Sequence, residues 1–401
     1  MIGQRGVPAT YGGIEHHVEQ VGSLLAARSD VEVTVYCRRQ YSSDVGREHL
    51  GMHLVVTPTL SSKHLEAISH SVTSTVHAVL SGADVVHYHA LGPGLVAPLV
   101  RYLSRGKVVL TVHGLDHERA KWKGPASRVL DVAHRMSGHV PDAVVTVSQS
   151  LTRHYEDRFD CSPVYVPNGV PVPAPGGLPG RLRSEYGLEP GRYALYVGRV
   201  VPEKRADLLV QAARSLPPGF KVAIVGGSSF SEDYVAEIAS LAGDDPRIVL
   251  PGFLYKDELA GVYANAAVFV QPSDLEGLPL TLLEAASYGI PVLASDIEPH
   301  REILADCRCR AHRLFPQGDE GALAEQLVAM LGDREALRRE ASCEAASLVA
   351  PYSWTAAADA LVDVYRTVTD AVPPLNRAVF AHADTEVHVL SVPTALARGH
   401  S

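Results

Sequence analysis

The feature that most constrains the fold is a regular alternation of short apolar runs, rich in β-branched residues, with helical patterns. Such alternation is typical of a parallel sheet with helices on both faces. It occurs in two successive sets, so the sequence predicts an α/β protein of two doubly wound, Rossmann-like domains, with a ligand in the cleft between them at the carboxyl ends of the strands. The predicted strands are 31–36, 54–56, 85–88, 108–112, 143–147 and 164–166, then 193–197, 222–225, 248–250, 268–270 and 292–294. The predicted helices of the second set are 206–215, 234–242, 257–264, 280–288 and 320–330.

A stretch rich in proline and glycine, residues 170–180, separates the two sets and suits neither a helix nor a central strand. A last helix is predicted at 353–365, with Ser353 as its N-cap, whereas residues 373–401 lack periodicity and are expected to be poorly ordered. The predicted organisation is an N-terminal domain over 1–170, a linker over 171–182 and a C-terminal domain over 183–350.

The first strand is an exception, because only Met1 and Ile2 precede the glycine-rich loop that starts at Gly3. Strands usually contain about five residues, and the first strand of such a sheet is normally central. We therefore expect the true start to lie upstream of Met1. Mass spectrometry of the native protein that found Met1 as the first residue would reject this hypothesis.

The composition disfavours several classes of protein. The net charge is −9 with histidine neutral, which disfavours a nucleic-acid partner. No apolar run reaches the roughly 20 residues that span a bilayer, and no basic stretch leads into an apolar one at the N-terminus, so we expect a cytoplasmic protein. The five cysteines lack the C-x₂-C spacing of zinc or redox sites; they are Cys37, Cys161, Cys307, Cys309 and Cys343.

The most specific motif runs from Asp274 to Glu284 and enters a predicted helix. Glu276 lies in the loop and Glu284 in the helix, so one carboxylate can address a ligand at the helix N-terminus while the other flanks it. The segment Gly277-Leu278-Pro279-Leu280 offers backbone N–H groups at the positive end of the helix dipole, which favours an anion. An ordinary acidic surface helix is the alternative, and the Gly-Leu-Pro insert argues against it.

Arg199 and Lys204 lie in the loop that follows the predicted strand 193–197. A guanidinium and an ammonium group there could neutralise a pyrophosphate and stabilise it as a leaving group, although a solvated basic loop is the alternative. Further backbone donors and an apolar wall are expected after the next two predicted strands, from Gly226, Gly227, Phe253 and Leu254.

The glycine-rich loop from Gly3 to Gly13 lacks the spacing of dinucleotide-binding and P-loop motifs, so neither a nicotinamide cofactor nor ATP hydrolysis is predicted. Gly12 and Gly13 have no Cβ and could let the backbone approach phosphates closely. His113 follows another predicted strand, and we expect it to project into the cleft.

No metal site is expected from the sequence. No Asp-x-Asp motif follows a strand to hold Mg²⁺ or Mn²⁺ against a diphosphate. The nearest candidates, His16, His17, His87 and His89, have no carboxylate placed to complete a site, so we interpret them as structural.

Together these motifs resemble those of the retaining glycosyltransferases of family 4, which have the two-domain GT-B fold, over nearly the whole chain. The resemblance rests on Arg199 and Lys204, on Glu276-x₇-Glu284, on Val-Ser-Gln-Ser at 147–150 and on Val-Pro-Asn-Gly-Val at 166–170. The opening loop and the segment 113–122 are similar to a bacterial subgroup described as rhamnosyltransferase-like.

The resemblance implies transfer of a sugar from a nucleotide diphosphate sugar to a cell-envelope or exopolysaccharide acceptor, with retention of configuration and without a metal or other cofactor. The departing phosphate would deprotonate the acceptor, so no protein nucleophile is needed. A helix within 351–372 would cross back onto the first domain. The implied roles are ribose binding by Glu284, sugar binding by Glu276 and His113, and diphosphate binding by Arg199 and Lys204, with Gly12 and Gly13 closing over it.

Residues 101–135 carry a basic surplus around Trp122 that could dock the protein on anionic lipid holding a lipid-linked acceptor, although a solvated basic face is the alternative. The basic residues are Arg101, Arg105, Lys107, Arg119, Lys121, Lys123, Arg128 and Arg135, against Asp116, Glu118 and Asp131.

Two other functions stay open at this stage. A nucleotide-sugar epimerase or a phosphorylase would use the same two domains, because a fold does not fix a function. A non-catalytic partner that binds a sugar nucleotide is the other alternative. We find neither extra acid–base carboxylates nor a pyridoxal signature, and the motif residues are all present, so the transferase is favoured.

Overall fold

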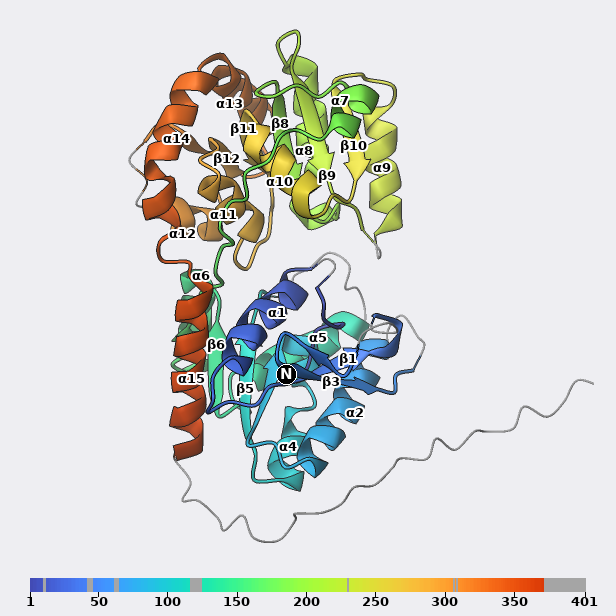
Figure 1. Cartoon of the computed structure of the whole chain (residues 1–401), viewed down its shortest axis with the longest axis vertical. Coiled ribbons are helices and arrows are strands. Elements are labelled where there is room, and N and C mark those ends of the chain that lie inside the picture. The colour runs from blue at the N-terminus through green and yellow to red at the C-terminus, as the bar shows by residue number, and fades with distance from the viewer. Residues whose placement is uncertain are drawn as a thin grey trace, which may run out of the picture.

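The computed structural model describes residues 1–9, 12–41, 46–60, 65–115, 125–228, 231–305, 307 and 309–370. It contains two α/β halves stacked along the long axis of the molecule, with the N-terminal half at the bottom of Figure 1 and the C-terminal half at the top. The residues predicted to form a poorly ordered tail, 373–401, lie outside the described residues. No helix among the residues described is both long and apolar enough to cross a membrane.

The N-terminal half contains two sheets, which the first two residues join. Ile2 pairs with Tyr88 in one sheet, and Tyr36 in the other donates its backbone N–H to the carbonyl of Met1 at 3.1 Å. All strands predicted for this half are present, and the two-residue β2 was not predicted. One sheet has the order β1 (Thr34–Arg38), β3 (Met52–Thr57), β2 (Glu48–His49); the other has the order β4 (Val85–His89), β5 (Lys107–Val112), β6 (Ala143–Thr146), β7 (Val164–Tyr165).

The C-terminal half is built on one six-stranded parallel sheet whose central strands are almost entirely buried, whereas the two edge strands are mostly half-buried. Its strand order reverses at β8, which lies between β9 and β11, so the loops after β8 and β11 emerge side by side at the same edge. The order is β10 (Ile248–Gly252), β9 (Lys221–Val225), β8 (Tyr193–Val197), β11 (Val268–Gln271), β12 (Val292–Ser295), β13 (His312–Phe315).

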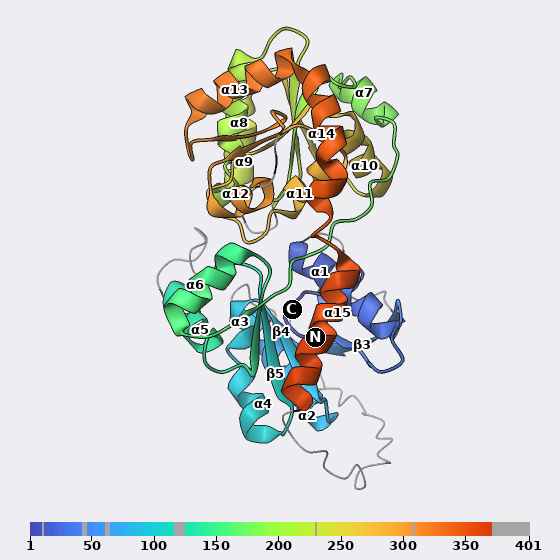
Figure 2. The ribbon, with the colours of Figure 1, turned by 90° about the vertical axis from the view of Figure 1, so that its left-hand side faces the viewer.

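Helices cover the sheets on both sides, as the alternating pattern predicts (Figures 1 and 2). In the N-terminal half they are α1 (Gly13–Ala26), α2 (Glu66–Leu80), α3 (Leu91–Gly94), α4 (Ala97–Leu103), α5 (Pro125–Ser137) and α6 (Gln149–Phe159). In the C-terminal half they are α7 (Gly180–Tyr186), α8 (Ala206–Ala212), α9 (Glu232–Ala242), α10 (Lys256–Asn265), α11 (Leu280–Ser287), α12 (Glu298–Leu304), α13 (Glu320–Gly332) and α14 (Arg334–Val349).

The last helix, α15 (Trp354–Asp370), returns to the N-terminal half and packs along α1, as Figure 2 shows. Ser353 caps it by accepting the N–H of Ala356 at 3.3 Å, as predicted. Its apolar face, including Trp354 and Leu361, belongs to the core that also contains Val18 and Val21 of α1. Because each large apolar side chain contributes about 1.5–3 kcal/mol when fully buried, the crossing is held by the core and not by surface contacts alone.

The chain between the halves runs beside the start of α15 (Figure 2). Val170 donates its N–H to the carbonyl of Tyr352 at 3.0 Å, and a Cβ on Gly169 would lie only 2.2 Å from the backbone nitrogen of Trp354. No helix or strand occupies residues 166–179, and α7 begins at Gly180, inside the predicted linker. The two segments that connect the halves therefore contact each other.

Candidate active site

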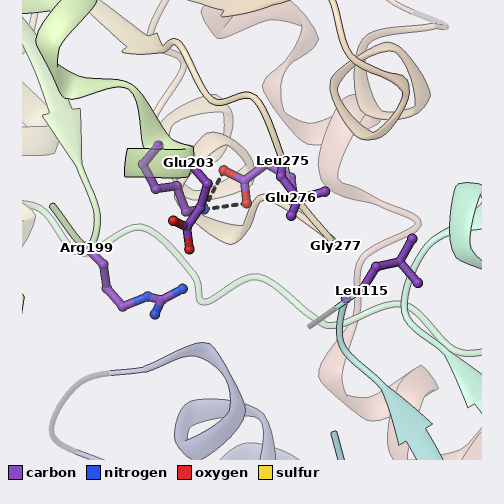
Figure 3. A pocket seen from close by; sticks show the side chains of 8 residues that line it. Leu115, Arg199, Glu203, Leu275, Glu276 and Gly277 are labelled. Carbon is purple, nitrogen blue, oxygen red and sulfur yellow. Dashed lines mark hydrogen bonds and ion pairs between the residues drawn. The ribbon is translucent and has the colours of Figure 1, made fainter. Parts of the chain in front are cut away.

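A pocket lies where the two halves meet, at the reversal of strand order in the C-terminal sheet. Figure 3 shows its side chains, which come from the loops after β8 and β11 and from the loop after β5 of the N-terminal half. It is lined by Gly114, Leu115, Arg199, Glu203, Lys204, Leu275, Glu276 and Gly277. The strand order thus brings together Arg199, Lys204, Glu276 and Gly277, which are far apart in sequence but were predicted as one site.

An ion pair between Lys204 and Glu276 lies at the centre of this pocket. The ammonium donates to both carboxylate oxygens, and the side chains are 18% and 5% exposed. Oε1 of Glu276 also accepts from Nε2 of Gln271 at 2.6 Å and from Oγ of Ser273 at 2.7 Å. Burial alone would raise the pKa of Glu276, but the charge of Lys204, the nearby His300 and the hydrogen bonds from Lys204 and Ser273 outweigh it and hold the pKa below its usual value. The carboxylate is therefore ionised and fixed in orientation.

Gln271 and Ser273 were missed in the sequence. They lie at the end of β11 and just after it, in the same strand-end segment as the motif. This position was the only feature of the sequence that could have marked them as site residues. Neutral polar side chains there are ordinary, so nothing marked them as supports for Glu276.

Arg199 extends from the loop after β8 and lines the pocket (Figure 3). Its backbone is fixed from below, because the hydroxyl of the buried Tyr196 donates to the Arg199 carbonyl at 2.8 Å. The next residue, Val200, donates its N–H to the carbonyl of Gly227 at 3.0 Å. The guanidinium is therefore presented on a rigid loop.

Gly226 and Gly227 allow three strand-end loops to pack closely. Gly226 has φ +132°, and a Cβ there would lie 1.9 Å from the carbonyl oxygen of Gly198. A Cβ on Gly227 would lie 2.8 Å from the ring of Phe253, which is 41% exposed and stacks on Tyr255. These glycines thus have a packing role beside the predicted one as backbone donors.

The predicted apolar wall divides between surface and interior. Phe253 presents an exposed ring, whereas Leu254 is only 4% exposed and belongs to the hydrophobic core. Leu278 is likewise buried in that core. Contact of these two leucines with a donor stays a prediction.

The N-terminal ends of α1 and α11 contact each other between the two halves. Leu280 begins α11 directly after Pro279, and its Cδ1 lies 3.7 Å from the position of a Cβ on Gly13, which begins α1. Gly12 precedes α1 with φ +115°, a conformation that favours glycine. Two sets of backbone N–H groups at positive helix ends therefore border the space between the halves.

Glu284 lies one turn into α11 and is partly buried. Its Oε2 accepts from the hydroxyl of Tyr263 at 2.9 Å, and the Tyr263 ring stacks on Tyr288. Burial raises the pKa of Glu284 to about 7, with the Tyr263 hydrogen bond acting in the opposite direction. The fold thus retains a carboxylate whose charged form it disfavours.

His113 follows β5 and contacts both halves. Its backbone carbonyl meets Gly277, where a Cβ would lie 2.0 Å away. Its Nε2 lies 3.3 Å from Nδ1 of His89, and its ring packs on His17. The next residues, Gly114 and Leu115, line the pocket, whereas His113 is not among its lining residues. The predicted contact of the His113 side chain with a sugar therefore stays a prediction.

The other histidines of this region have partners inside the fold. His17 lies 2.6 Å from Oδ1 of Asn168, and burial lowers the pKa of His17 to about 4. His87 bonds to the hydroxyls of Tyr365 and Thr111, both at 2.7 Å. The ring nitrogens of His17, His89 and His113 that could bind a metal lie within 4.8 Å of one another. The three histidines come from α1, from β4 and from the loop after β5. Because they are far apart in sequence, their grouping was not predicted.

A second contact between the halves joins α12 to α6. The carboxylate of Glu302 accepts the backbone N–H groups of Gln149 and Ser150, at 2.8 and 3.2 Å, at the start of α6. Ser148 caps the same helix through the N–H of Leu151. The Val-Ser-Gln-Ser motif thus forms the start of α6, to which Glu302 of the C-terminal half is hydrogen-bonded. The sequence did not predict this contact.

Two stacked doubly wound domains, a returning C-terminal helix and a pocket between strand-end loops are the features of the GT-B fold. Residues 11–172 match the family described as Glycosyltransferase Family 4, and residues 181–348 match the family described as Glycosyl transferases group 1. The chain belongs to the family 4 glycosyltransferases. The two matched segments cover most of both halves but do not include α15.

Individual proteins agree with this assignment. The chain is 30% identical over 312 residues to the GDP-mannose-dependent alpha-(1-6)-phosphatidylinositol monomannoside mannosyltransferase of Mycolicibacterium smegmatis, covering 72% of this chain and 78% of that protein. It is 25% identical over 388 residues to the alpha-maltose-1-phosphate synthase of the same organism, covering 90% and 97%. Among solved structures, HepE of Anabaena in complex with UDP and glucose has a TM-score of 0.72 at 17% identity, covering 89% and 96%. The rhamnosyltransferase-like subgroup stays a prediction.

We predict that Gly277→Ala holds the halves apart, because its Cβ would lie 2.0 Å from the His113 carbonyl oxygen. The kcat for sugar transfer should fall roughly 100-fold, since small displacements of reacting groups are costly. Gly332→Ala is the matched control, because a Cβ there meets nothing within 4 Å. A Gly277→Ala enzyme with wild-type kcat would contradict this account of the contact.

We also predict that Glu284→Gln stabilises the fold. Because the folded-state pKa of Glu284 is raised to about 7, the charged carboxylate destabilises the fold from its ordinary pKa upward, and the cost is complete above about pH 7. The free energy of unfolding should rise by on the order of 1–3 kcal/mol at about pH 8, and by less at about pH 5, in urea denaturation. Glu335→Gln, at a side chain 79% exposed, is the control. An equal effect at both pH values would contradict the prediction.

Proposed function

We propose that this enzyme transfers a glycosyl residue from a nucleotide diphosphate sugar to a saccharide or lipid-linked acceptor of the cell envelope or an exopolysaccharide, with retention of anomeric configuration and without a metal ion. The observation that carries the proposal is the pocket in which Arg199, the Lys204–Glu276 pair and Gly277, three residues before α11, converge. Such a set of cations and backbone donors suits a diphosphate. Support also comes from the relatives, one GDP-mannose-dependent and one bound to UDP and glucose.

The proposed binding mode divides the donor along the pocket. Arg199 and Lys204 would hold the diphosphate, with the N-termini of α1 and α11 adding backbone N–H groups. Lys204 has three N–H donors, and the pocket lining contains two cations, Arg199 and Lys204, and two carboxylates, Glu203 and Glu276. The backbone N–H groups at the helix ends would therefore contribute to binding the diphosphate. Glu276 would accept sugar hydroxyls and Glu284 the ribose hydroxyls.

The proposed chemistry needs no protein nucleophile. The bond between the anomeric carbon and the phosphate oxygen breaks, the acceptor oxygen attacks from the same face, and its proton passes to the departing phosphate. The Glu276 carboxylate in the pocket is already bound by Lys204, Gln271 and Ser273, which suits positioning of hydroxyls better than nucleophilic attack. Arg199, Lys204 and the helix ends would stabilise the charge of the leaving diphosphate, as a metal ion does in other sites.

The acceptor side of the proposal concerns the N-terminal half. Tyr102 and Leu103 are 86% and 58% exposed beside Arg101, a surface that would suit contact with anionic lipid. Asp142 pairs with Arg101 at 3.0 Å and approaches Lys107 at 3.8 Å, which lowers the charge available there. Arg119, Lys121, Trp122 and Lys123 lie outside the described residues.

Thermal unfolding with UDP, GDP, dTDP and ADP, each with and without Mg²⁺, tests the donor site. One nucleotide should raise the unfolding temperature by a few degrees without metal, because a ligand at about 100 times its Kd stabilises the folded state by about 2.7 kcal/mol. Arg199→Ala should lose most of this shift, whereas Arg214→Ala, in the short helix at Ala213–Ser215, should retain it.

The same experiment can contradict the proposal. The donor site is wrong if no nucleotide shifts the folded protein, or if Arg199→Ala and Arg214→Ala respond alike. A shift that requires Mg²⁺ would reject metal independence alone. Incubation of the responding nucleotide's sugars with an acceptor, followed by NMR assignment of the product anomer, then checks retention.

A further inference from the structure

A cluster of metal-ligating side chains lies at the edge of the C-terminal sheet opposite the pocket. Cys307 and Cys309 are in the turn between α12 and β13, and His312 is the first residue of β13. His312 pairs with Val292, which begins β12, so the cluster is at the amino ends of the strands, whereas the pocket is at their carboxyl ends. Glu344 reaches it from α14, the helix on the outer side of this half in Figure 1.

The side chains converge on one point. The ligand atoms of Cys307, Cys309 and His312 all lie within 4.8 Å of one another, and the two sulfur atoms are 3.4 Å apart. The Cys307 thiol donates to Oε2 of Glu344 at 2.7 Å. Four groups from a turn, a strand and a helix, distant in sequence, therefore face the same small volume.

His312 gives an independent indication that a group belongs between them. Both of its ring nitrogens are buried, and neither has a hydrogen-bond partner among the described residues. An imidazole has one donor and one acceptor, and leaving them unsatisfied in the interior destabilises the fold. A bound ion would accept the lone pair of one nitrogen and offset part of this cost.

We propose that Cys307, Cys309, His312 and Glu344 bind one Zn²⁺ ion. Two thiolates, an imidazole and a carboxylate are all ligands that zinc prefers, and they supply the four positions of its tetrahedral geometry. Zinc–sulfur bonds of about 2.3 Å place two ligating sulfurs slightly under 4 Å apart, so the 3.4 Å separation needs only a small adjustment. Binding displaces the two thiol protons, which pass to solvent.

The proposed ion would be structural. Its four positions are filled by protein, whereas catalytic zinc sites keep one position open for water or substrate. It would tie the turn before the edge strand β13 to α14, the helix that also packs on α11. The site is separate from the pocket, so it does not bear on whether transfer itself needs a metal ion.

Cobalt substitution tests the proposal on the full-length, reduced, metal-free protein with any purification tag removed. Titration with Co²⁺ should give thiolate-to-cobalt charge-transfer absorption and tetrahedral d–d bands that saturate at one ion per chain, and Zn²⁺ should remove them. Zn²⁺ should also raise the unfolding temperature. Cys309→Ser should lose both effects. Cys343→Ser, at an exposed neighbour of Glu344 on α14, is the matched control and should retain them.

A second variant keeps the test informative if Cys309→Ser does not fold. Glu344→Gln preserves both thiols and the imidazole, so it should keep the thiolate band but bind Co²⁺ at least tenfold more weakly. The proposal is overturned if the folded, reduced wild-type protein shows no thiolate band with stoichiometric Co²⁺, or if Cys309→Ser and Cys343→Ser bind Co²⁺ with the same affinity and the same thiolate band. Mass spectrometry that finds a Cys307–Cys309 disulfide, with no cobalt binding after reduction, would identify a redox pair instead.

Discussion

The partly buried ion pair between Lys204 and Glu276 is the interaction on which the rest of the site depends. The two residues follow adjacent strands, β8 and β11, at the reversal of strand order, so the sheet places them together before any ligand binds. Removing charges from water is costly, and breaking this pair would leave the carboxylate of Glu276, whose side chain is 5% exposed, without its charge partner. Gln271 and Ser273 complete the coordination of the carboxylate. The pair therefore fixes both loops, and Arg199 extends from one of them toward the opposite half.

The second requirement is that the N-terminal half stays close to this prearranged surface. Three features provide it: α15 returns to the first half and packs on α1, Glu302 binds the start of α6, and Gly277 meets the carbonyl of His113. The last contact exists only because residue 277 has no Cβ. Close approach of the halves would exclude water from the diphosphate and strengthen its interactions with the cations, which suits stabilisation of a charged leaving group.

The sequence predicts the strands that are short apolar runs, including the edge strands β7 and β10, but it misses β13 and α14. Strand β13 begins with His312 and Arg313, and α14 buries little beyond Leu337 and Ala341, so neither has a strong periodic signal. The charged site residues were predictable because parallel strands end at one edge. The support of Glu276 by Gln271, the grouping of His17 with His113, and the approach of Glu344 to Cys307 were not. These contacts join distant elements through side chains whose types are common elsewhere.

Hydrogen–deuterium exchange with and without a nucleotide diphosphate tests the central claim, that the loops after β8 and β11 form one diphosphate site that closes against α1. With whichever of UDP, GDP, dTDP or ADP binds, the account predicts slower exchange in peptides covering 198–205 and 273–284, and at the start of α1. Peptides of α2 and α4, remote from the pocket, should not change. Protection confined to other segments, or protection of only one of the two loops, would contradict the account.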